Sequence, residues 1–459
     1  MCPAPESFKL CWFAKGTLFL PQRSATMAMT TKTAEKRSPL RGFVFHLHPR
    51  TVPESTLRFT LSFGLGGMAA TLFIILLFSG ILQLFSYAPE TGSAYDSILA
   101  MYGTAPLAGL VRNIHHWSAH LLVIIALLHL LRVVLTGASD QQRRFNWLIG
   151  LGLFLLVLFG NFTGYLLPWD QRAYWAVTIF TNMVEYIPLF GPRFGLLLRG
   201  GTEVGQLTLS TFFAIHIGLI PALFCVLLIY HFWMIRKAGG LVRPEDLAGR
   251  SARRIATVPA LISREAAVGL GVAALVFCFA ALIDAPLGDM ANPGESPNPA
   301  KAAWYFMGLQ ELLLHFHPVF AICIIPLTSL LLLALVPFIP GAATAPGIWC
   351  GGSRGRKLAA LAFTLGLLAC LGGVLIDDLL LNSTSGSGGP PAWVSRGIVP
   401  LIALVAAQGL LYLFLSRQRT YGRAASIMAL LLLNFGLICG LTIIGTWFRG
   451  PSMMLAPLW

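Results

Sequence analysis

The sequence predicts an all-α polytopic membrane protein: a four-helix bundle followed by a second helical domain, with about nine transmembrane helices in total. Of the 459 residues, 56% are hydrophobic and only 11% are charged, and the mean hydropathy is +0.75. This composition excludes a soluble domain of the same size, which would carry more charge on its surface. Apolar runs of about 20 residues, the length of a helix that crosses a bilayer, recur along the chain.

Nine of these runs are expected to span the membrane, and the last three are marked by hydropathy alone. We expect them at residues 60–85, 114–136, 147–167, 211–235, 260–284, 319–339, 357–377, 398–416 and 424–447. The polar stretches between them predict an N-terminal cytoplasmic segment with an interfacial helix (1–58), a four-span domain (59–240), a cytoplasmic linker (241–257), a second domain with a long outer loop (258–345) and additional spans (346–459).

The net charge of +14 is explained by membrane topology. If the N-terminus is cytoplasmic, 25 of the 32 Lys and Arg residues fall on the cytoplasmic side. This asymmetry follows the positive-inside rule and predicts that orientation. The basic loops would then meet anionic lipid headgroups of the membrane, so no nucleic-acid partner is expected.

Two histidine pairs on apolar segments are the most informative pattern in the chain. His115 and His129 are 14 residues apart, and His216 and His231 are 15 apart. At about 100° per residue, each pair returns to nearly the same helix face, and its members are separated by roughly 21–22 Å. The iron of an electron-transfer b-type haem takes two axial imidazoles. These four histidines are therefore candidate metal ligands for two stacked, non-covalent b-type haems.

The order of the spans predicts how these histidines pair. One span separates the two helices that carry them, so both helices cross the membrane in the same direction. We therefore expect His115 to face His216 near the outer surface, and His129 to face His231 near the cytoplasmic surface. A haem-free transporter whose buried histidines relay protons is the alternative from another functional class.

Two further histidines on the second span require a separate interpretation. His116 and His120 project about 140° and 180° away from His129 around the helix. We expect both to face elsewhere, as polar packing contacts or as contacts to a partner.

Glycines in the flanking spans and arginines near the histidines support two haem sites, one near each membrane surface. Glycines recur 14 residues apart in the first and third spans, where the lack of a side chain would let a flat macrocycle approach the backbone. Arginines lie three residues from a histidine at each end of the second span, where they would pair with haem propionates or anchor the membrane interface. These cofactor-binding candidates are Gly66, Gly80, Gly150, Gly164, Arg112 and Arg132.

The strings IHHWSAH, TGYLLPWDQRAYWAV and HFWMIRK resemble cytochrome b, the membrane core of quinol–cytochrome c oxidoreductases, the bc-type complexes. The resemblance covers about residues 42–340, and the histidine spacing is similar to that of the cyanobacterial and plastid branch. The fused length and the C-terminal string IGTWFRGPSMMLAPLW resemble bacterial versions, which implies a bacterial inner membrane. The cysteine that tethers an extra c-type haem in that branch aligns with Gly64, and no CxxCH motif occurs, so no covalent haem is expected.

The resemblance implies a Q cycle. Quinol (menaquinol or ubiquinol) would be oxidised at the outer side, with one electron passing to a Rieske-type iron–sulfur protein and then to a c-type cytochrome. The other electron would pass through both haems to quinone on the cytoplasmic side, near Arg236. A dimeric complex is also implied. The alternative is a di-haem membrane anchor of another quinone-linked oxidoreductase, although such anchors usually stop at four or five helices.

The outer quinol site departs from the family pattern. The family's Pro-Glu-Trp-Tyr motif corresponds here to Ala302-Ala303-Trp304-Tyr305, so Ala303 replaces the expected Glu. Quinol oxidation releases protons, and an accepting group must lie within hydrogen-bond reach. We favour Glu311, about two helical turns beyond Trp304, although it could instead bond within its loop. The catalytic candidates are Trp304, Tyr305, Glu311, Asp170 and Tyr174, with His315 and His317 as further outer-side alternatives.

Overall fold

The computed structural model describes residues 48–103, 107–139, 142–244, 253–381, 390–418 and 420–456. Within this part of the chain, nine helices are long and apolar enough to cross a membrane, which confirms the predicted all-α polytopic class. Each coincides with one of the nine predicted spans. They are Leu65–Gln83, Ala108–Leu135, Arg144–Leu166, Gln206–Lys237, Thr257–Leu282, Phe320–Phe338, Ser353–Leu379, Val394–Arg417 and Arg423–Trp447.

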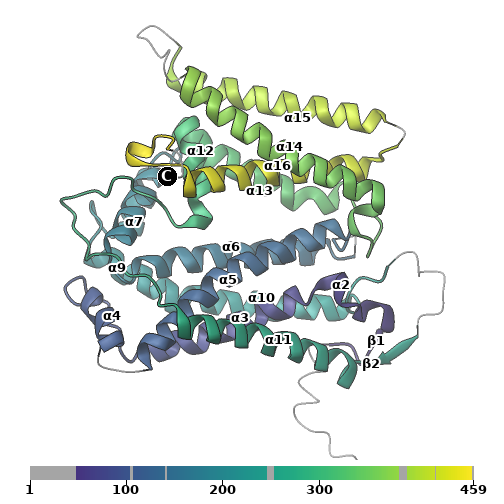
Figure 1. The fold of residues 1–459 in the computed structure, drawn as a ribbon, viewed down its shortest axis with the longest axis horizontal. Coiled ribbons are helices and arrows are strands. Elements are labelled where there is room, and N and C mark those ends of the chain that lie inside the picture. The colour runs from purple at the N-terminus through teal and green to yellow at the C-terminus, as the bar shows by residue number, and fades with distance from the viewer. Residues whose placement is uncertain are drawn as a thin grey trace, which may run out of the picture. The chain divides into compact units, whose positions relative to one another are not determined.

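The first four spans form a bundle (Figure 1). Helix α5 (Ala108–Leu135) packs against α3 (Leu65–Gln83) and α6 (Arg144–Leu166), and α6 packs against α10 (Ile220–Lys237). The fourth span begins as α9 (Gln206–Ala214) and passes into α10 through the π-helical turn η2 (Ile215–Leu219). The rings of Phe73 and Phe224 stack 4.1 Å apart between the first and fourth spans. Because apolar side chains fill this interior, the bundle positions its few buried polar residues firmly.

Helix α11 (Thr257–Leu282) packs on α3 and α5, so the fifth span joins the first bundle. Its residues Val272, Val276 and Ala280 belong to the same buried cluster as Leu72 of α3. All of the described residues lie in one compact unit that begins at Phe43. The predicted boundary at 241–257 therefore divides the sequence, but the helix that follows it packs directly on the helices that precede it.

The region before the first span is only partly described. Strand β1 (Thr51–Pro53) pairs antiparallel with β2 (Arg254–Ala256), and the 3-10 turn η1 (Glu54–Leu57) and the short helix α2 (Phe59–Ser62) follow β1. The predicted interfacial helix is thus absent from residues 48–58, and residues 1–47 lie outside the described part. The two strands tie the start of the first span to the start of the fifth.

The loops at one end of the bundle contain short helices. These are α4 (Ala94–Gly103), α7 (Gln171–Val184), α8 (Gly191–Arg199), η4 (Trp304–Phe306) and α12 (Met307–His315). The side chain of Asp170 caps α7 by accepting a hydrogen bond from the backbone N–H of Ala173 at 2.9 Å, and it accepts another from Gly288 at 2.9 Å. These bonds fix the segment after α6 to the segment after α11.

The last four spans complete the fold. The helical segments of these spans and of the turns beside them are η5 (Phe320–Ile324), α13 (Ile325–Leu335), η6 (Val336–Phe338), η7 (Trp349–Gly351), α14 (Ser353–Ile376), η8 (Asp377–Leu381), η10 (Val394–Ile398), α15 (Val399–Arg417), α16 (Arg423–Trp447) and η11 (Pro451–Met453). Helices α14 and α16 pack backbone to backbone, because a Cβ at Gly366 would lie 2.1 Å from the Leu433 carbonyl oxygen. Helix α12 also packs on α16, which connects this region to the loop that carries Trp304.

Candidate haem and quinol sites

The structure brings the four predicted histidines together in two facing pairs. The ring centroids of His115 and His216 are 6.1 Å apart, and those of His129 and His231 are 6.5 Å apart. Two imidazoles bound to opposite sides of one metal, with metal–nitrogen bonds of about 2 Å, have centroids separated by roughly 6 Å. Both separations therefore fit a single iron between the rings. First pairs with first and second with second, as the order of the spans predicts.

Each predicted glycine lies against one of these imidazoles. The spacing of the glycines predicts contact with a macrocycle, whereas the structure places them directly against the histidine rings. A side chain at these positions would displace the ring that it meets. The nearest ring atom to an added Cβ would be Cε1 in every case: His129 at 3.2 Å from Gly66, His115 at 3.2 Å from Gly80, His231 at 3.7 Å from Gly150 and His216 at 2.6 Å from Gly164.

Two hydroxyls that the sequence analysis missed orient one histidine pair. Ser79 Oγ lies 3.0 Å from His115 Nδ1, and Thr163 Oγ1 lies 3.1 Å from His216 Nδ1. Occupying Nδ1 leaves Nε2 as the ligating nitrogen and fixes the orientation of the ring. The signal was present in the sequence, because each hydroxyl residue directly precedes a paired glycine.

Each histidine pair lines its own cavity. The His115 cavity has a volume of about 300 Å³ and contains His115, His216 and their two glycines. Tyr305 also lines this cavity, as do His116 and His120, the histidines predicted to face elsewhere. Their rings, 4.5 Å apart, take no part in the facing pairs, but they border the same space.

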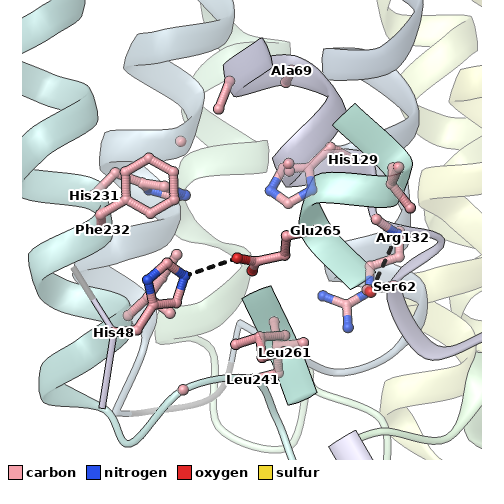
Figure 2. Close-up of a pocket in the computed structure, with 18 of the residues that line it drawn as sticks. His48, Ser62, Ala69, His129, Arg132, His231, Phe232, Leu241, Leu261 and Glu265 are labelled. Carbon is pink, nitrogen blue, oxygen red and sulfur yellow. Dashed lines mark hydrogen bonds and ion pairs between the residues drawn. The ribbon is translucent and has the colours of Figure 1, made fainter. Parts of the chain in front are cut away.

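The His129 cavity is larger, about 440 Å³. Figure 2 shows His129, His231, His48 and Glu265 around it. His48 Nε2 lies 3.2 Å from a carboxylate oxygen of Glu265. The sequence analysis missed this pair, although Glu265 stands inside a predicted span, where ionisable residues usually mark functional sites.

The two predicted propionate partners differ in what their guanidinium groups bind. Both are buried, with 5% of the side chain exposed. Arg112 donates hydrogen bonds to the carbonyl oxygens of Ala285 and Pro286 at 2.8 and 3.0 Å. Arg132 donates from Nε to the Leu61 carbonyl at 2.7 Å, while its buried Nη2 has no partner among the described residues. A propionate at the edge of the His129 cavity would supply that missing acceptor.

Trp304 and Tyr305 lie beside the His115 cavity, as their resemblance to the quinol-site motif implies. Tyr305 lines the cavity, and burial raises its pKa, so its hydroxyl stays protonated. The indole of Trp304 donates a hydrogen bond to Nδ1 of His120 at 2.7 Å. Ala303, in place of the expected Glu, is buried and offers no polar group.

Two other predicted site residues have structural partners. Asp170 lines the His115 cavity, but both of its carboxylate oxygens already accept backbone hydrogen bonds. Tyr174 is buried in an aromatic cluster, with its ring 5.6 Å from that of Trp169, and it does not line the cavity.

At the other end of the bundle, Arg236 lies exposed in the last turn of α10, outside the lining of the His129 cavity.

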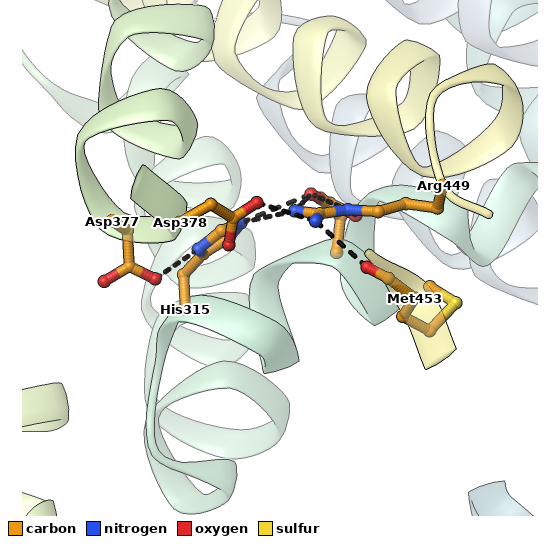
Figure 3. Close-up of polar contacts among 6 residues, drawn as sticks. His315, Asp377, Asp378, Arg449 and Met453 are labelled. Atoms are coloured by element: carbon orange, nitrogen blue, oxygen red, sulfur yellow. Dashed lines mark hydrogen bonds and ion pairs between the residues drawn. The ribbon is translucent and has the colours of Figure 1, made fainter. Parts of the chain in front are cut away.

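Glu311, the favoured proton acceptor, is completely buried in an ion cluster with Arg449 and His315, and it does not line the His115 cavity. Figure 3 shows Arg449, His315, Asp377 and Asp378 of this cluster. Both carboxylate oxygens of Glu311 accept hydrogen bonds from Arg449 Nε at 3.0 Å. His315 bridges Glu311 and Asp377 through its two ring nitrogens, at 3.2 and 2.6 Å. Burial opposes ionisation of Glu311, but the hydrogen bonds from His315 and Arg449 outweigh it and lower its pKa. This arrangement argues against Glu311 as the acceptor at the quinol site.

The remaining outer-side alternatives lie elsewhere in the structure. His315 belongs to the Glu311 cluster, where Asp378 also accepts a hydrogen bond from Arg449 at 2.6 Å. His317 stands at the start of η5, where its backbone N–H bonds to the Arg396 carbonyl at 2.7 Å. Neither histidine lines the His115 cavity as the described residues form it.

A membrane helical bundle with two facing imidazole pairs in its interior cavities is the architecture of a b-type haem protein. Residues 52–239 match the family model described as Cytochrome b/b6/petB. Cytochrome b6 of Synechococcus elongatus is 37% identical over 205 residues, which cover 45% of this chain and 94% of the relative. Cytochrome b6 of Cyanidium caldarium is 42% identical over 174 residues, covering 38% and 81%. The chain therefore belongs to the cytochrome b/b6 family.

The fold extends the likeness beyond the matched region. A solved structure described as a hyperthermophilic respiratory Complex III superposes with a TM-score of 0.64, covering 89% of this chain and 97% of that one at 21% identity. The similarity therefore includes spans beyond the four-helix bundle. As a cytochrome b subunit, the chain is a multi-pass membrane protein that binds b-type haem and transfers electrons across the membrane within a quinol-oxidising complex.

Proposed function

We propose that the chain binds two b-type haems, one between His115 and His216 and the other between His129 and His231. The observation that carries this proposal is that each pair has the ring separation of a bis-imidazole site and a matched pair of glycines. Two such haems would supply a one-electron path between the two membrane surfaces. The four histidines hold this path at fixed depth, because each is anchored on a rigid spanning helix.

Quinol oxidation is assigned to the outer side of the membrane, at the edge of the His115 cavity beside the haem. Tyr305 of the family's quinol motif lines this cavity, and Trp304 is hydrogen-bonded to His120 of its lining. The excess of basic residues on the opposite loops supports this orientation and a cytoplasmic N-terminus in a bacterial inner membrane. One electron of each quinol passes to a Rieske-type iron–sulfur protein and a c-type cytochrome in a dimeric complex, and the other crosses the membrane, which makes the reaction a Q cycle.

Quinone reduction is assigned to the His129 cavity on the cytoplasmic side. Reduction of a quinone to quinol takes up two protons as well as two electrons, so a reduction site needs groups that deliver protons. The His48–Glu265 pair borders the cavity and is suited to this task. Arg132, with a buried and unsatisfied Nη2 among the described residues, supplies positive charge at the same cavity.

A di-haem anchor of another quinone-linked oxidoreductase is the competing function. It would use the same histidines with a single quinone site and no bifurcation of electrons. The docking of Trp304 from the second helical region onto the first bundle favours the Q cycle, because it places the quinol motif beside the His115 cavity.

Isolated complex tests this proposal through the response of the haems to the outer acceptor. An inhibitor first blocks the His129 cavity. Quinol plus oxidised c-type cytochrome should then reduce more b-type haem than quinol alone, because each quinol delivers one electron to the iron–sulfur protein and one to the haems. An anchor subunit would lose haem reduction when the acceptor is added. That loss, or the absence of quinol-dependent reduction of the acceptor, would contradict the proposed function.

A further inference from the structure

His120 is held by the loop that carries the quinol-site motif, although it is 184 residues away in sequence. Its ring stacks against that of Trp304, with centroids 6.2 Å apart and an interplanar angle of 25°. The ring of Tyr305 meets it edge-on at 6.1 Å. His120 is thus enclosed by the two aromatic residues of the motif, while its own ring borders the His115 cavity.

The hydrogen bond from Trp304 determines which nitrogen of His120 carries the proton. An indole N–H can only donate, so Nδ1 of His120 must be the acceptor in this 2.7 Å bond. A neutral imidazole has one N–H, which therefore lies on Nε2. Protonated His120 would have no acceptor left for Trp304, so the bond also holds the ring neutral. His120 is in consequence a hydrogen-bond donor at the cavity and not a proton acceptor.

The Nε2–H of His120 makes no hydrogen bond within the described part of the chain, whereas its Nδ1 is fully used. A polar group inside a spanning helix is costly unless it has a partner. A ligand oxygen in the His115 cavity would supply that partner. The alternative is that His120 only packs against the loop and needs no hydrogen bond besides the one from Trp304. That alternative leaves its Nε2–H without an acceptor.

On the basis of the proposed function, we infer that His120 donates a hydrogen bond from Nε2 to a ring oxygen of the quinol in the His115 cavity. The ligand class is a benzoquinol or naphthoquinol, whose hydroxyl oxygen has lone pairs to accept the bond. As the hydroxyl proton passes to a water molecule, the quinol oxygen gains negative charge and the bond strengthens, since hydrogen bonds to charged acceptors are stronger than neutral ones. His120 therefore stabilises the reacting oxygen more than the bound quinol.

Three variants of the intact complex test this role, with quinol-to-cytochrome turnover as the assay. His120→Leu removes the donor, and kcat/KM for quinol should fall about 10- to 100-fold, mostly in kcat. His120→Gln keeps an amide that accepts from Trp304 and donates to the quinol, so it should recover to within about threefold of wild type. Trp304→Phe releases the tautomer of His120, and kcat/KM should fall about three- to tenfold.

Trp147→Phe is the matched control, because it removes an indole hydrogen bond away from His120, from Trp147 to the Leu333 carbonyl at 3.0 Å. It lies outside the cavity lining and should retain wild-type turnover. All variants are first compared for haem content after reduction with dithionite, so that loss of cofactor is separated from loss of the hydrogen bond.

A second measurement reads the bond directly. The infrared C=O band of ¹³C-labelled quinone bound to the complex should shift to higher frequency in His120→Leu and remain in place in His120→Gln. Wild-type turnover with an unmoved band in His120→Leu overturns the inference while leaving the proposed function intact. If His120→Leu loses haem, the Trp304→Phe variant is used as the test instead. Unchanged turnover in Trp304→Phe overturns the inference. An inactive wild-type complex would instead contradict the proposed function.

Discussion

Arg449 and Glu311 form a buried ion pair across 138 residues of sequence, with the guanidinium Nε 3.0 Å from both carboxylate oxygens. Glu311 is completely buried, and Arg449 is 5% exposed. The pair joins α12, which follows the Trp304 loop, to the segment after the last span. The C-terminal spans are therefore linked to the quinol region by buried charges as well as by apolar packing.

Breaking this pair on one side should destabilise the protein strongly. Glu311→Gln removes the fully buried carboxylate beside Arg449 and leaves only the partly exposed Asp378 to balance its charge, which we expect to cost about 3 kcal/mol. The triple variant Glu311→Leu, Arg449→Met and Asp378→Asn should recover most of that loss, because it removes the charges of both ion pairs of Arg449 together. Unfolding midpoints of the complex in detergent measure both effects. Glu54→Gln, which breaks an exposed pair with Arg253, is the control and should cost about 1 kcal/mol or less.

The same cluster predicts a pH dependence of stability. Burial lowers the pKa of His315, but its hydrogen bonds with Glu311 and Asp377 outweigh burial and raise it above the ordinary 6.5. A raised pKa contributes stability that is fully present below pH 6.5 and is lost as the pH rises through the folded-state pKa. The difference in unfolding midpoint between wild type and His315→Gln should therefore be largest below pH 6.5 and shrink in alkaline buffer. A difference that grows with pH would contradict this assignment.

The paired glycines predict a graded series of substitutions. At Gly164 an added Cβ would lie 2.6 Å from His216 Cε1, whereas at Gly150 it would lie at an ordinary 3.7 Å from His231 Cε1. Gly164→Ala should displace His216 and remove one haem, roughly half of the b-type absorbance. Gly150→Ala should retain both haems. Haem content per protein measures the pair, and equal loss in the two variants would argue against direct packing of glycine on histidine.

Arg132 should tune the potential of the haem in the His129 cavity. Its unsatisfied Nη2 lies at that cavity among the described residues, and a nearby positive charge favours the reduced state of the iron. Arg132→Gln should lower the midpoint potential of this haem by roughly 60 mV, equivalent to about 1.4 kcal/mol for one electron. Redox titration resolves the two haems, and the haem of the His115 cavity serves as the internal reference. A shift confined to that other haem would contradict the placement of Arg132.

Local sequence patterns predicted most of the fold. The nine spans follow from hydropathy, because only continuous apolar helices satisfy backbone hydrogen bonds in lipid. The facing of His115 with His216 followed from helical spacing and from the direction of the spans. The glycines were found by their matching 14-residue intervals, although their immediate neighbours are the imidazole rings.

Features that depend on long-range packing were missed. Nothing local to Glu311 indicates that Arg449 lies beside it, so helical spacing from Trp304 assigned it to the wrong environment. His120 was expected to face away from the histidine pairs, but its ring lines the His115 cavity, and its contact with Trp304 depends on a distant loop that folds over α5. His48 and Glu265 come together only because β1 and β2 pair. Such contacts join parts of the chain that no periodic pattern relates.

The most direct test of the central claim is the haem content of histidine variants. The purified wild-type protein should contain two b-type haems per chain in a reduced-minus-oxidised spectrum and pyridine haemochrome assay. His129→Leu should leave one haem, held by His115 and His216, and His115→Leu should leave the other, with a different midpoint potential. A colourless wild-type protein, or a full complement of haem in either variant, would contradict the assignment of these imidazoles as the ligands of a transmembrane electron path.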